Sequence, residues 1–322
     1  MKRVAMKGPK TSVVVDWPDA NYTDDQILIQ TKYVGVCMSE HHAWAHAKEN
    51  DAFGHEPMGI VAAVGKNVCG FAVGDKVSGL WGGSLPGSGG MIEYNIADPA
   101  RDVIVKIPEN LRDVDVILEP LACMMSAVSK AKLTMPGTRV CLVGVGYMGC
   151  GVIGLLKLRG AYVVAVDVRK ESLENAKKYG ADEVYFADEA RQALANSFDC
   201  VMEWGETEES LDLAINLTAE CGQLCIGAYH TGGKRLVDVE QLNVKAIDCH
   251  SVHPREGALN VIGAQNAAKL LASGAWNYID VPTKVYPRSK FDQAQEELET
   301  KFGSHMKAVI DMTMEDGEPF II

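Results

Sequence analysis

The chain has 322 residues, 47% hydrophobic and 23% charged, a balance that is typical of a globular protein long enough for two domains. Its net charge of −12 argues against a nucleic-acid partner and against an anionic membrane surface, because both need clustered lysine and arginine. The nine cysteines, an odd number, and an N-terminal stretch without signal-peptide features predict reduced thiols in the cytoplasm. We expect most cysteines to be ordinary buried residues, among them Cys141, Cys200, Cys221, Cys225 and Cys249.

The first third of the chain, up to about Leu118, consists of short alternating stretches separated by glycine, proline and aspartate. This pattern is typical of irregular antiparallel β structure with tight turns. The stretches are VVVDW, QILIQTKYVGV, GIVAAVG, DKVSGLW and MIEYNIA.

From Cys123 to about Val252 the pattern changes to apolar strands that alternate with helix-like segments. This alternation predicts βαβ units and a parallel sheet, hence an α/β domain. A long helix over residues 257–273 follows, and the last strand, HMKAVIDM, is expected to return to the first domain. We therefore predict one domain from residues 1–121 together with 256–322, and a second from residues 122–255. The expected parallel strands are RVCLVG, YVVAVD, EVYF, FDCVMEW and GQLCIGAYH.

Residues 140–156 contain no charged side chain, which is close to the shortest length of a membrane span. Five glycines disfavour a continuous helix there, and breaks that face lipid would leave backbone groups unpaired. We favour a buried strand over residues 139–143, a glycine turn, and a helix that starts near Tyr147.

That glycine turn, residues 144–149, matches the pattern GxGxxG between a predicted strand and a predicted helix. Asp167 ends the next strand, at the distance expected for a residue that binds the adenosine ribose. The helix N-terminus would bind a pyrophosphate, and Asp167 would repel a 2′-phosphate, so we predict NAD as the cofactor. Because Arg169 lies two residues after Asp167, some tolerance of NADP stays open. The alternative to a cofactor site is a purely structural turn, with Asp167 as a solvated residue. The expected cofactor contacts are Gly144, Gly146, Tyr147, Met148, Gly149, Asp167 and Arg169.

A second cluster of chemically active residues lies earlier in the chain, in GVCMSEHH and FGHEPMG. Cys37, His55 and Glu56 offer a thiolate, an imidazole and a carboxylate, which are ligands that suit Zn²⁺. Each taken alone is more often a packing or surface residue. Together, ahead of a dinucleotide-binding pattern, they predict a metal site.

These motifs resemble the zinc-dependent medium-chain alcohol and polyol dehydrogenases, and the resemblance covers nearly the whole chain. It rests on GVCMSEHH, on FAVGDKV and GGMIEY, on Glu119-Pro120, on GVGYMG with Asp167, and above all on the specific string GHEPMGIVAAVG. The family implies a GroES-like catalytic domain, a Rossmann domain that binds NAD, and a catalytic zinc. It also implies pairing into a homodimer or homotetramer through the edge strand of the Rossmann sheet, here residues 246–252.

The resemblance assigns Cys37 and His55 as zinc ligands. Glu119 stands where the alcohol branch has a third cysteine, as in the polyol and threonine dehydrogenases, although a carboxylate near a helix N-terminus is favourable in itself. Glu56 is similar to a glutamate that binds zinc directly or replaces a departing water in several relatives. Either Glu56 or Glu119 is the resting ligand.

Two departures from the family pattern matter. Many relatives hold a second, structural zinc with four closely spaced cysteines, but WGGSLPGSGGMIEY has none, so we expect one catalytic zinc only. The family usually has aspartate where Glu40 stands, next to the zinc-bound histidine, so the geometry there is expected to differ.

The family chemistry is hydride transfer from a zinc-activated alcohol to the nicotinamide ring. Ser39 resembles the hydroxyl that relays the released proton, and His42 resembles the histidine that passes it to solvent. If the alignment with the family is shifted by one residue, His41 takes the role given to His42. Ser39 has the alternative role of capping a short helix. Glu56 completes the set of expected catalytic residues.

The substrate is expected to be polar and hydroxylated, such as a polyol, a sugar or an amino alcohol, because the zinc shell is rich in carboxylate. Two alternatives remain: a threonine-type amino-acid dehydrogenase, and a catalytically silent NAD-binding regulator. Retention of the expected ligands and relay residues together argues against a silent protein. The expected pocket-lining residues are His46, Trp44, Phe53, Trp81 and His230.

Overall fold

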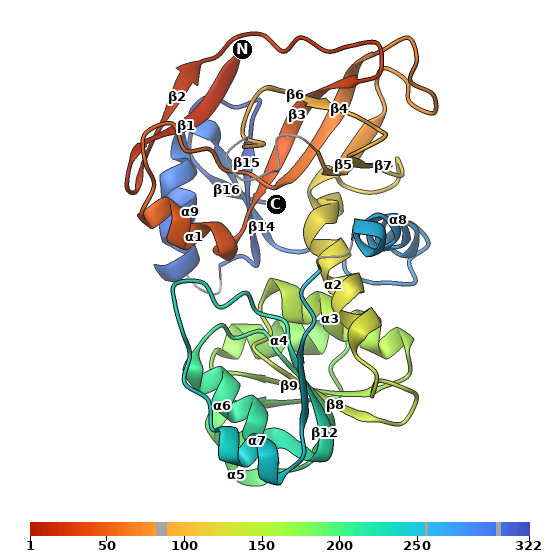
Figure 1. Ribbon diagram of the computed structural model, residues 1–322, viewed down its shortest axis with the longest axis vertical. Coiled ribbons are helices and arrows are strands. Elements are labelled where there is room, and N and C mark those ends of the chain that lie inside the picture. The colour runs from red at the N-terminus through yellow and green to blue at the C-terminus, as the bar shows by residue number, and fades with distance from the viewer. Residues whose placement is uncertain (82–88, 255–256, 301–303) are drawn as a thin grey trace. The chain divides into compact units, whose positions relative to one another are not determined.

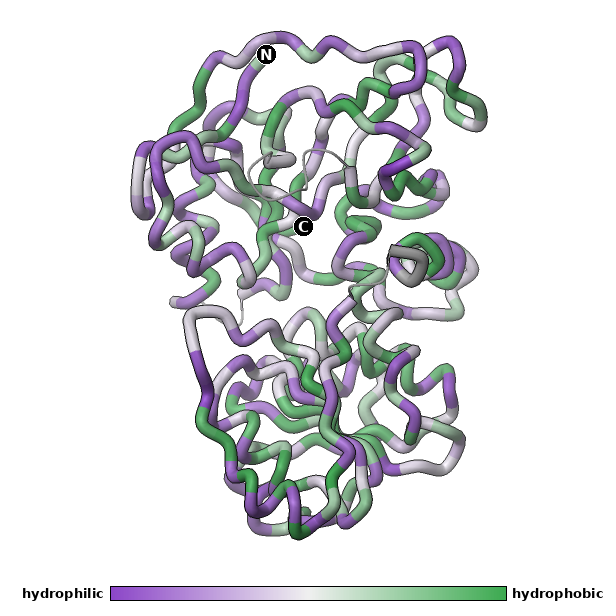
Figure 2. The backbone as a smooth tube through the Cα atoms, in the orientation of Figure 1, coloured by the Kyte–Doolittle hydropathy of each residue, from purple (hydrophilic) through white to green (hydrophobic). Residues whose placement is uncertain are grey.

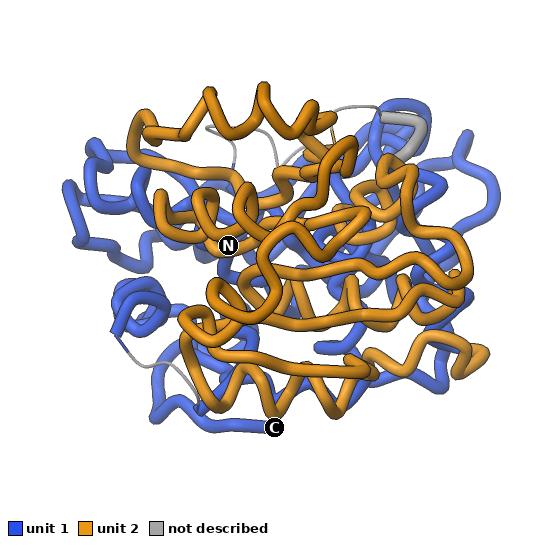
Figure 3. Tube along the Cα trace, turned by 90° about the horizontal axis from the view of Figure 1, so that it is seen from below, with its two compact units in different colours: residues 1–122, 260–272, 279–322 blue, residues 123–259, 273–278 orange. Residues whose placement is uncertain are grey.

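The computed structural model describes residues 1–81, 89–254, 257–300 and 304–322, with only the backbone at 257–259. These residues form two compact units, coloured separately in Figure 3. Unit 1 contains residues 1–122, 260–272 and 279–322, and unit 2 contains residues 123–259 and 273–278. The sequence-based division assigned residues 273–278 to the first domain. In the structure they pack within unit 2, where Trp276 Nε1 donates a hydrogen bond to the Gly151 carbonyl (3.1 Å).

Unit 1 is built on a mostly antiparallel sheet with eight strands among the described residues (Figure 1). Strand β3 (Ile27–Val36) lies at its centre and pairs with β4 (Glu56–Val64), β6 and β15. The family's GroES-like type of irregular β domain is thereby confirmed. The other strands of unit 1 are β1 (Lys2–Gly8) and β2 (Thr11–Asp16), which form a separate pair, and β5 (Lys76–Leu80), β6 (Tyr94–Ala97), β7 (Val103–Lys106), β14 (Thr283–Pro287), β15 (Lys307–Asp311) and β16 (Phe320–Ile321).

The prediction that HMKAVIDM is the last strand was wrong. It forms β15, which pairs with β3 and so does return to the first unit's sheet. The chain then adds β16, which pairs with β14 through two residues. A two-residue strand has no periodicity that a sequence pattern could detect.

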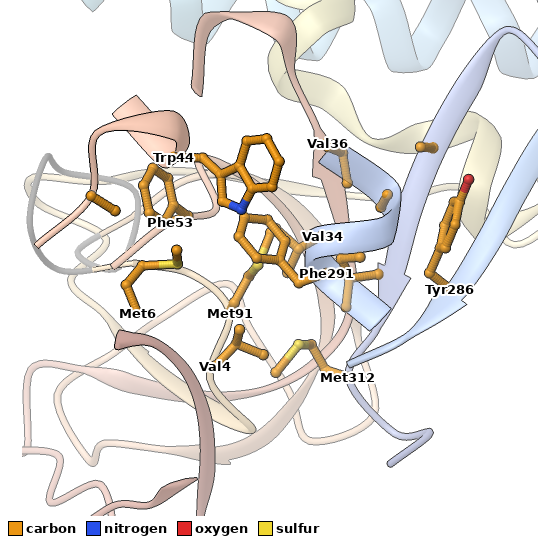
Figure 4. Packing of buried hydrophobic residues seen from close by; sticks show 14 residues of the cluster. Val4, Met6, Val34, Val36, Trp44, Phe53, Met91, Tyr286, Phe291 and Met312 are labelled. Atoms are coloured by element: carbon orange, nitrogen blue, oxygen red, sulfur yellow. The ribbon is translucent and has the colours of Figure 1, made fainter. Parts of the chain in front are cut away.

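Two short helices of unit 1 cover one side of its core. Helix α1 (Met38–Ala45) packs near α9 (Phe291–Thr300), and Trp44 Nε1 donates to Asp292 Oδ1 (2.8 Å). Figure 4 shows Trp44, Phe53 and Phe291 pointing into the same apolar cluster. The remaining helices with residues in unit 1 are η2 (Asp113–Val116), α2 (Leu118–Lys130), which continues into unit 2, α8 (Gly257–Ala272) and η3 (Arg288–Lys290).

Unit 2 contains the predicted parallel sheet, whose described strands follow the order β10-β9-β8-β11-β12-β13. The central strands are apolar along their length, as the hydrophobic colour in Figure 2 shows, because helices cover both faces of such a sheet. This confirms the Rossmann-like α/β domain. The strands are β8 (Arg139–Val143), β9 (Tyr162–Asp167), β10 (Glu183–Phe186), β11 (Phe198–Glu203), β12 (Thr218–Ile226) and β13 (Asp248–Ser251), and the helices are α3 (Tyr147–Leu158), α4 (Lys170–Lys178), α5 (Ala187–Ala193), α6 (Glu208–Leu217) and α7 (Val239–Val244).

The uncharged stretch at residues 140–156 is divided between β8 and α3, as predicted. None of the helices in the described parts of the chain is long and apolar enough to cross a membrane.

The expectation for the cysteines was partly wrong. Cys141, Cys200 and Cys225 are buried in the parallel sheet, but Cys221 and Cys249 are exposed. Cys249 lies on the edge strand β13, and Cys221 has a left-handed backbone (φ 56°) near the start of β12. An apolar neighbourhood in the sequence does not reveal which residues sit at a sheet edge.

Candidate functional site

The end of β3 lies beside the start of β4, because Gly35 pairs with Glu56 in antiparallel register. Cys37 directly follows β3 and His55 directly precedes β4, so this pairing brings the two side chains together. The ligand atoms of Cys37, His55 and Glu56 all lie within 4.8 Å of one another. Among the described residues, this is the one group of three or more such side chains close enough to share a metal ion.

The His55 ring is fixed by Glu40. Glu40 Oε1 accepts hydrogen bonds from His55 Nδ1 (2.9 Å) and from the Gly54 backbone N–H (2.8 Å). A carboxylate can only accept, so Nδ1 carries the hydrogen and Nε2 is left for a metal. Glu40 therefore makes the hydrogen bond that orients a metal-binding histidine, although its side chain is longer than that of the aspartate usual in the family.

The surroundings of His55 are strongly negative. Burial alone would lower the pKa of His55, but hydrogen bonds to Cys37 and Glu40, with the charges of Glu40 and Glu119, raise it far above its usual value. Surroundings that favour a positive charge at this point also favour a divalent cation. With one sulfur, one nitrogen and one carboxylate donor, these residues fit Zn²⁺.

Glu56 is 1% exposed and forms an ion pair with Lys307 on β15, which is 7% exposed. Lys307 also donates to the Val36 carbonyl (3.1 Å). Burial alone would lower the pKa of Lys307, but the charges of Glu56 and Cys37 outweigh it and raise the pKa. Gly35 makes room for this pair, since a Cβ atom there would lie 1.8 Å from Glu56 Oε2.

In unit 2, the turn between β8 and α3 has the conformation that its glycines predict. Gly144 has φ 87°, and a Cβ there would lie 2.6 Å from the Gly205 nitrogen. Gly146 is the N-cap of α3, and no side chain caps the helix there. The N-terminus of a helix favours the binding of an anion. Gly149 lies in the first turn of that helix.

Asp167 ends β9 beside this turn and is 6% exposed. Its Oδ2 accepts from the Val145 N–H (2.8 Å), and its Oδ1 accepts from the backbone N–H (2.9 Å) and Nε (3.1 Å) of Arg169. The Arg169 guanidinium thus lies between Asp167 and the open space at Gly146, where a Cβ would meet only Arg169 Nη2, at 3.6 Å.

Comparison with known proteins agrees with both parts of this geometry. Residues 23–109 match the alcohol dehydrogenase GroES-like domain, and residues 144–253 match the zinc-binding dehydrogenase domain. The chain belongs to the zinc-dependent medium-chain dehydrogenase family. Every residue of the metal cluster and of the glycine turn lies within these two matches.

Curated relatives cover most of the chain. D-arabitol-phosphate dehydrogenase of Enterococcus avium is 26% identical over 98% of this chain and 99% of its own. A probable D-xylulose reductase A of Aspergillus fumigatus is 26% identical over 88% of each chain. Among solved structures, a thermostable alcohol dehydrogenase from Pyrobaculum aerophilum has a TM-score of 0.81 at 23% identity and covers 97% of this chain and 99% of its own.

In this medium-chain dehydrogenase, Glu119 lies in the first turn of α2 and outside the three-residue metal cluster. Its charge nevertheless acts on the cluster, because it raises the pKa of both His55 and Lys307. The structure therefore brings Glu56 to Cys37 and His55 and keeps Glu119 nearby.

The predicted relay residues lie on α1. Ser39 Oγ donates to Cys37 Sγ (3.3 Å), and the helix N-cap is Cys37, so Ser39 is not the helix cap. His42 is exposed and its ring lies 4.4 Å from that of His46. His41 is buried and its Nε2 is paired with Glu299 Oε1 (2.8 Å), which makes it a poor substitute.

Three of the predicted pocket-lining residues are core residues. Trp44 and Phe53 belong to the core cluster of Figure 4, and Trp81 is buried in a second core. His46 is exposed and is the C-cap of α1. His230 lines a pocket of unit 2. Aromatic residues near a predicted site pack into the core as readily as into a cleft, because burial of their area is favourable in both.

Sequence reasoning missed Lys307 and Glu203. Each is a charged residue inside an apolar strand, HMKAVIDM and FDCVMEW, and that interruption was the available signal. Both are buried in the structure.

Proposed function

We propose that this chain is an NAD-dependent zinc dehydrogenase that oxidises a secondary alcohol of a polyol, sugar or amino alcohol. The observation that supports this most directly is the cluster of Cys37, His55 and Glu56 in surroundings that favour a cation. Curated relatives named for D-arabitol phosphate and D-xylulose point to the same substrate class.

Cys37 and His55 would hold the zinc, with Glu56 or Glu119 as the third protein ligand. Bound Zn²⁺ would supply a Lewis acid that makes a substrate hydroxyl more acidic and its carbon a better hydride donor. Lys307 neutralises Glu56 while that carboxylate is away from the metal. Ser39, beside Cys37, would accept the proton from the substrate hydroxyl and pass it toward His42 at the surface.

On the cofactor side, we propose that α3 binds the pyrophosphate and that Asp167 holds the ribose of NAD. Arg169 would have to leave Asp167 for both ribose hydroxyls to bind. We also propose one zinc per chain and a homodimer or homotetramer that pairs through β13, a strand at the edge of the described sheet.

Cys37→Ser tests the metal assignment. We expect it to lower zinc content and abolish NADH production on a panel of polyols, sugars and L-threonine. Cys69→Ser, which changes an exposed cysteine of the same unit, should keep both. A Cys37→Ser protein that retains zinc and activity would overturn the proposal. A wild type that binds NADH but oxidises nothing on the panel would favour the silent regulator.

A further inference from the structure

A buried glutamate–histidine pair lies at the carboxyl ends of β11 and β12. Glu203 is the last residue of β11 and is 0% exposed. Its Oε2 lies 2.9 Å from Nε2 of His230, whose side chain is 13% exposed. Open α/β sheets bind their ligands at this edge, outside the carboxyl ends of the strands.

The position of Glu203 is fixed by its other oxygen. Oε1 accepts from the N–H groups of Gly205 (2.7 Å) and Glu206 (2.9 Å) and from Ser210 Oγ (2.6 Å). A carboxylate only accepts, so Nε2 of His230 carries a hydrogen.

In the neutral imidazole this leaves Nδ1 of His230 as a hydrogen-bond acceptor. Among the described residues it is a buried atom without a hydrogen-bond partner. A buried polar atom without a protein partner in a native protein usually has an ordered water or a bound molecule as its partner.

The backbone around the pair is also unusual. His230 and Glu206 have φ angles of 51° and 63°, a left-handed conformation that is uncommon for residues other than glycine. The two loops are tied together, because Glu206 Oε1 accepts from both the N–H and the hydroxyl of Thr231 (3.0 Å each). Such strained positions cluster at binding and active sites.

His230 lines a pocket of about 570 Å³ whose walls all come from unit 2. Lys130 and His253 stand on the same wall, with Lys130 Nζ bonded to the His253 carbonyl (2.8 Å). The Tyr229 ring lies 5.2 Å from that of His253. The lining is mixed, with polar groups from Lys130, His230, Ser251 and His253 beside the apolar Ile226 and Ala228, and suits a ligand with both hydrogen-bonding and apolar parts.

We propose that His230, held by Glu203, accepts a hydrogen bond from an O–H or N–H group of the ligand that occupies this pocket. This inference rests on the proposed function, which supplies two sources of such a group. One is a hydroxyl of the polyol substrate, and the other is the carboxamide NH₂ of the nicotinamide. Glu203 is a positioning residue, because it acts by setting the tautomer and orientation of His230.

His230→Asn tests the contact, since asparagine tolerates the left-handed backbone while it removes the imidazole. NADH binding would be measured by fluorescence, ADP-ribose binding by calorimetry, and KM with the best substrate of the panel. His250→Asn on β13 is the matched control, because His250 does not line the pocket. A contact to the carboxamide should weaken NADH about three- to tenfold and leave ADP-ribose unchanged. A contact to the substrate should instead raise KM by a similar factor and leave NADH unchanged.

Glu203→Gln is the second variant, in case the first fails to fold. A glutamine NH₂ can donate to Nε2, which would move the ring hydrogen to Nδ1 and turn the acceptor into a donor. We expect the same selective loss as in His230→Asn, whereas a merely structural pair would lower the melting temperature and leave ligand affinities unchanged. Wild-type values of NADH affinity, ADP-ribose affinity and KM in folded variants would overturn the inference. If the wild type oxidises no polyol, the proposed function fails. If His230→Asn then also changes neither the affinity for NADH nor that for ADP-ribose, this inference fails as well.

Discussion

Glu56 and Glu119 are two carboxylates near one metal cluster, but their surroundings differ. Glu56 is buried and neutralised by Lys307, while Glu119 lies in the first turn of a helix, where a negative charge is favourable. Removal of Lys307 would leave a buried carboxylate without its countercharge, a loss of about 3–5 kcal/mol in typical proteins. The pair of Glu56 and Lys307 therefore holds a carboxylate next to Cys37 and His55, and the pair as a whole carries no net charge.

The relay assignment predicts a specific loss in His42→Ala. Zinc content and NADH affinity should stay at wild-type levels, while turnover falls by about 10²–10⁴ if proton transfer controls the rate. The loss should shrink as pH rises, because hydroxide can then take the proton directly. His46→Ala is the control, since His46 is the exposed C-cap of the same helix and its ring lies beside that of His42. Full activity of His42→Ala at neutral pH would remove His42 from the relay.

Asp167→Gly should weaken NADH binding and improve NADPH relative to NADH. Each lost hydrogen bond with an unpaired partner costs about 1–3 kcal/mol, and the loss of the carboxylate frees Arg169 for a 2′-phosphate. Asp167→Asn is the matched control, because its amide oxygen can still accept from the Val145 N–H. Dissociation constants for both cofactors measure the effect. A wild type that prefers NADPH contradicts the role given to Asp167.

At the scale of secondary-structure elements, Asp113 attaches η2 to two strands. Its carboxylate accepts from Lys32 on β3 (2.5 Å) and from Lys76 on β5 (2.7 Å). Burial alone would raise the pKa of Asp113, but these two lysines outweigh it and hold the pKa below its ordinary value of 3.8.

Asp113→Asn should therefore destabilise the protein in a pH-dependent way. Because both lysines are about one-third exposed, we expect a loss of about 1 kcal/mol at pH 7. A carboxyl with a lowered pKa stabilises the fold above its unfolded pKa, and this stabilisation is lost as pH falls through the folded pKa. Urea denaturation at pH 7 and pH 3 should show the gap between wild type and variant closing at the lower pH. An equal gap at both would contradict the ion-pair account.

The exposed edge of strand β13 predicts that copies of this chain pair into a dimer or tetramer. Among the described strands it pairs only with β12, so its outer edge presents backbone groups that a second copy could satisfy. Light scattering at micromolar concentration should give a dimer or tetramer. Cys249→Lys places a charge on this exposed strand and should shift the protein toward monomer. A monomeric wild type would refute the interface.

At the scale of the whole molecule, the metal content is the sharpest expectation. The described residues contain one group able to share a metal ion, and no cysteine lies between Trp81 and Tyr94, although residues 82–88 are outside the described structure. Elemental analysis should give one zinc per chain, and prolonged chelation should remove that zinc and the activity together. Two tightly held zinc ions would show that a structural site exists.

Much of this protein could be predicted from local sequence. The turn from β8 to α3 was predictable because a glycine pattern between a strand and a helix has few structural solutions. The alternation of strands and helices predicted the parallel sheet for a similar reason, since its buried strands are apolar on both faces. Cys37, His55 and Glu56 were recognisable because few other roles bring those three donors together ahead of such a turn in the sequence.

The tertiary structure alone decided which side chains meet across long distances in the chain. Lys307 reaches Glu56 only because β15 and β4 both pair with β3, and His230 reaches Glu203 only because β12 lies beside β11. Trp44 and Phe53 likewise became core residues because α9 packs against them. A sequence determines local conformation through short-range sterics and periodicity, whereas these contacts depend on strand order and packing, which no local pattern contains.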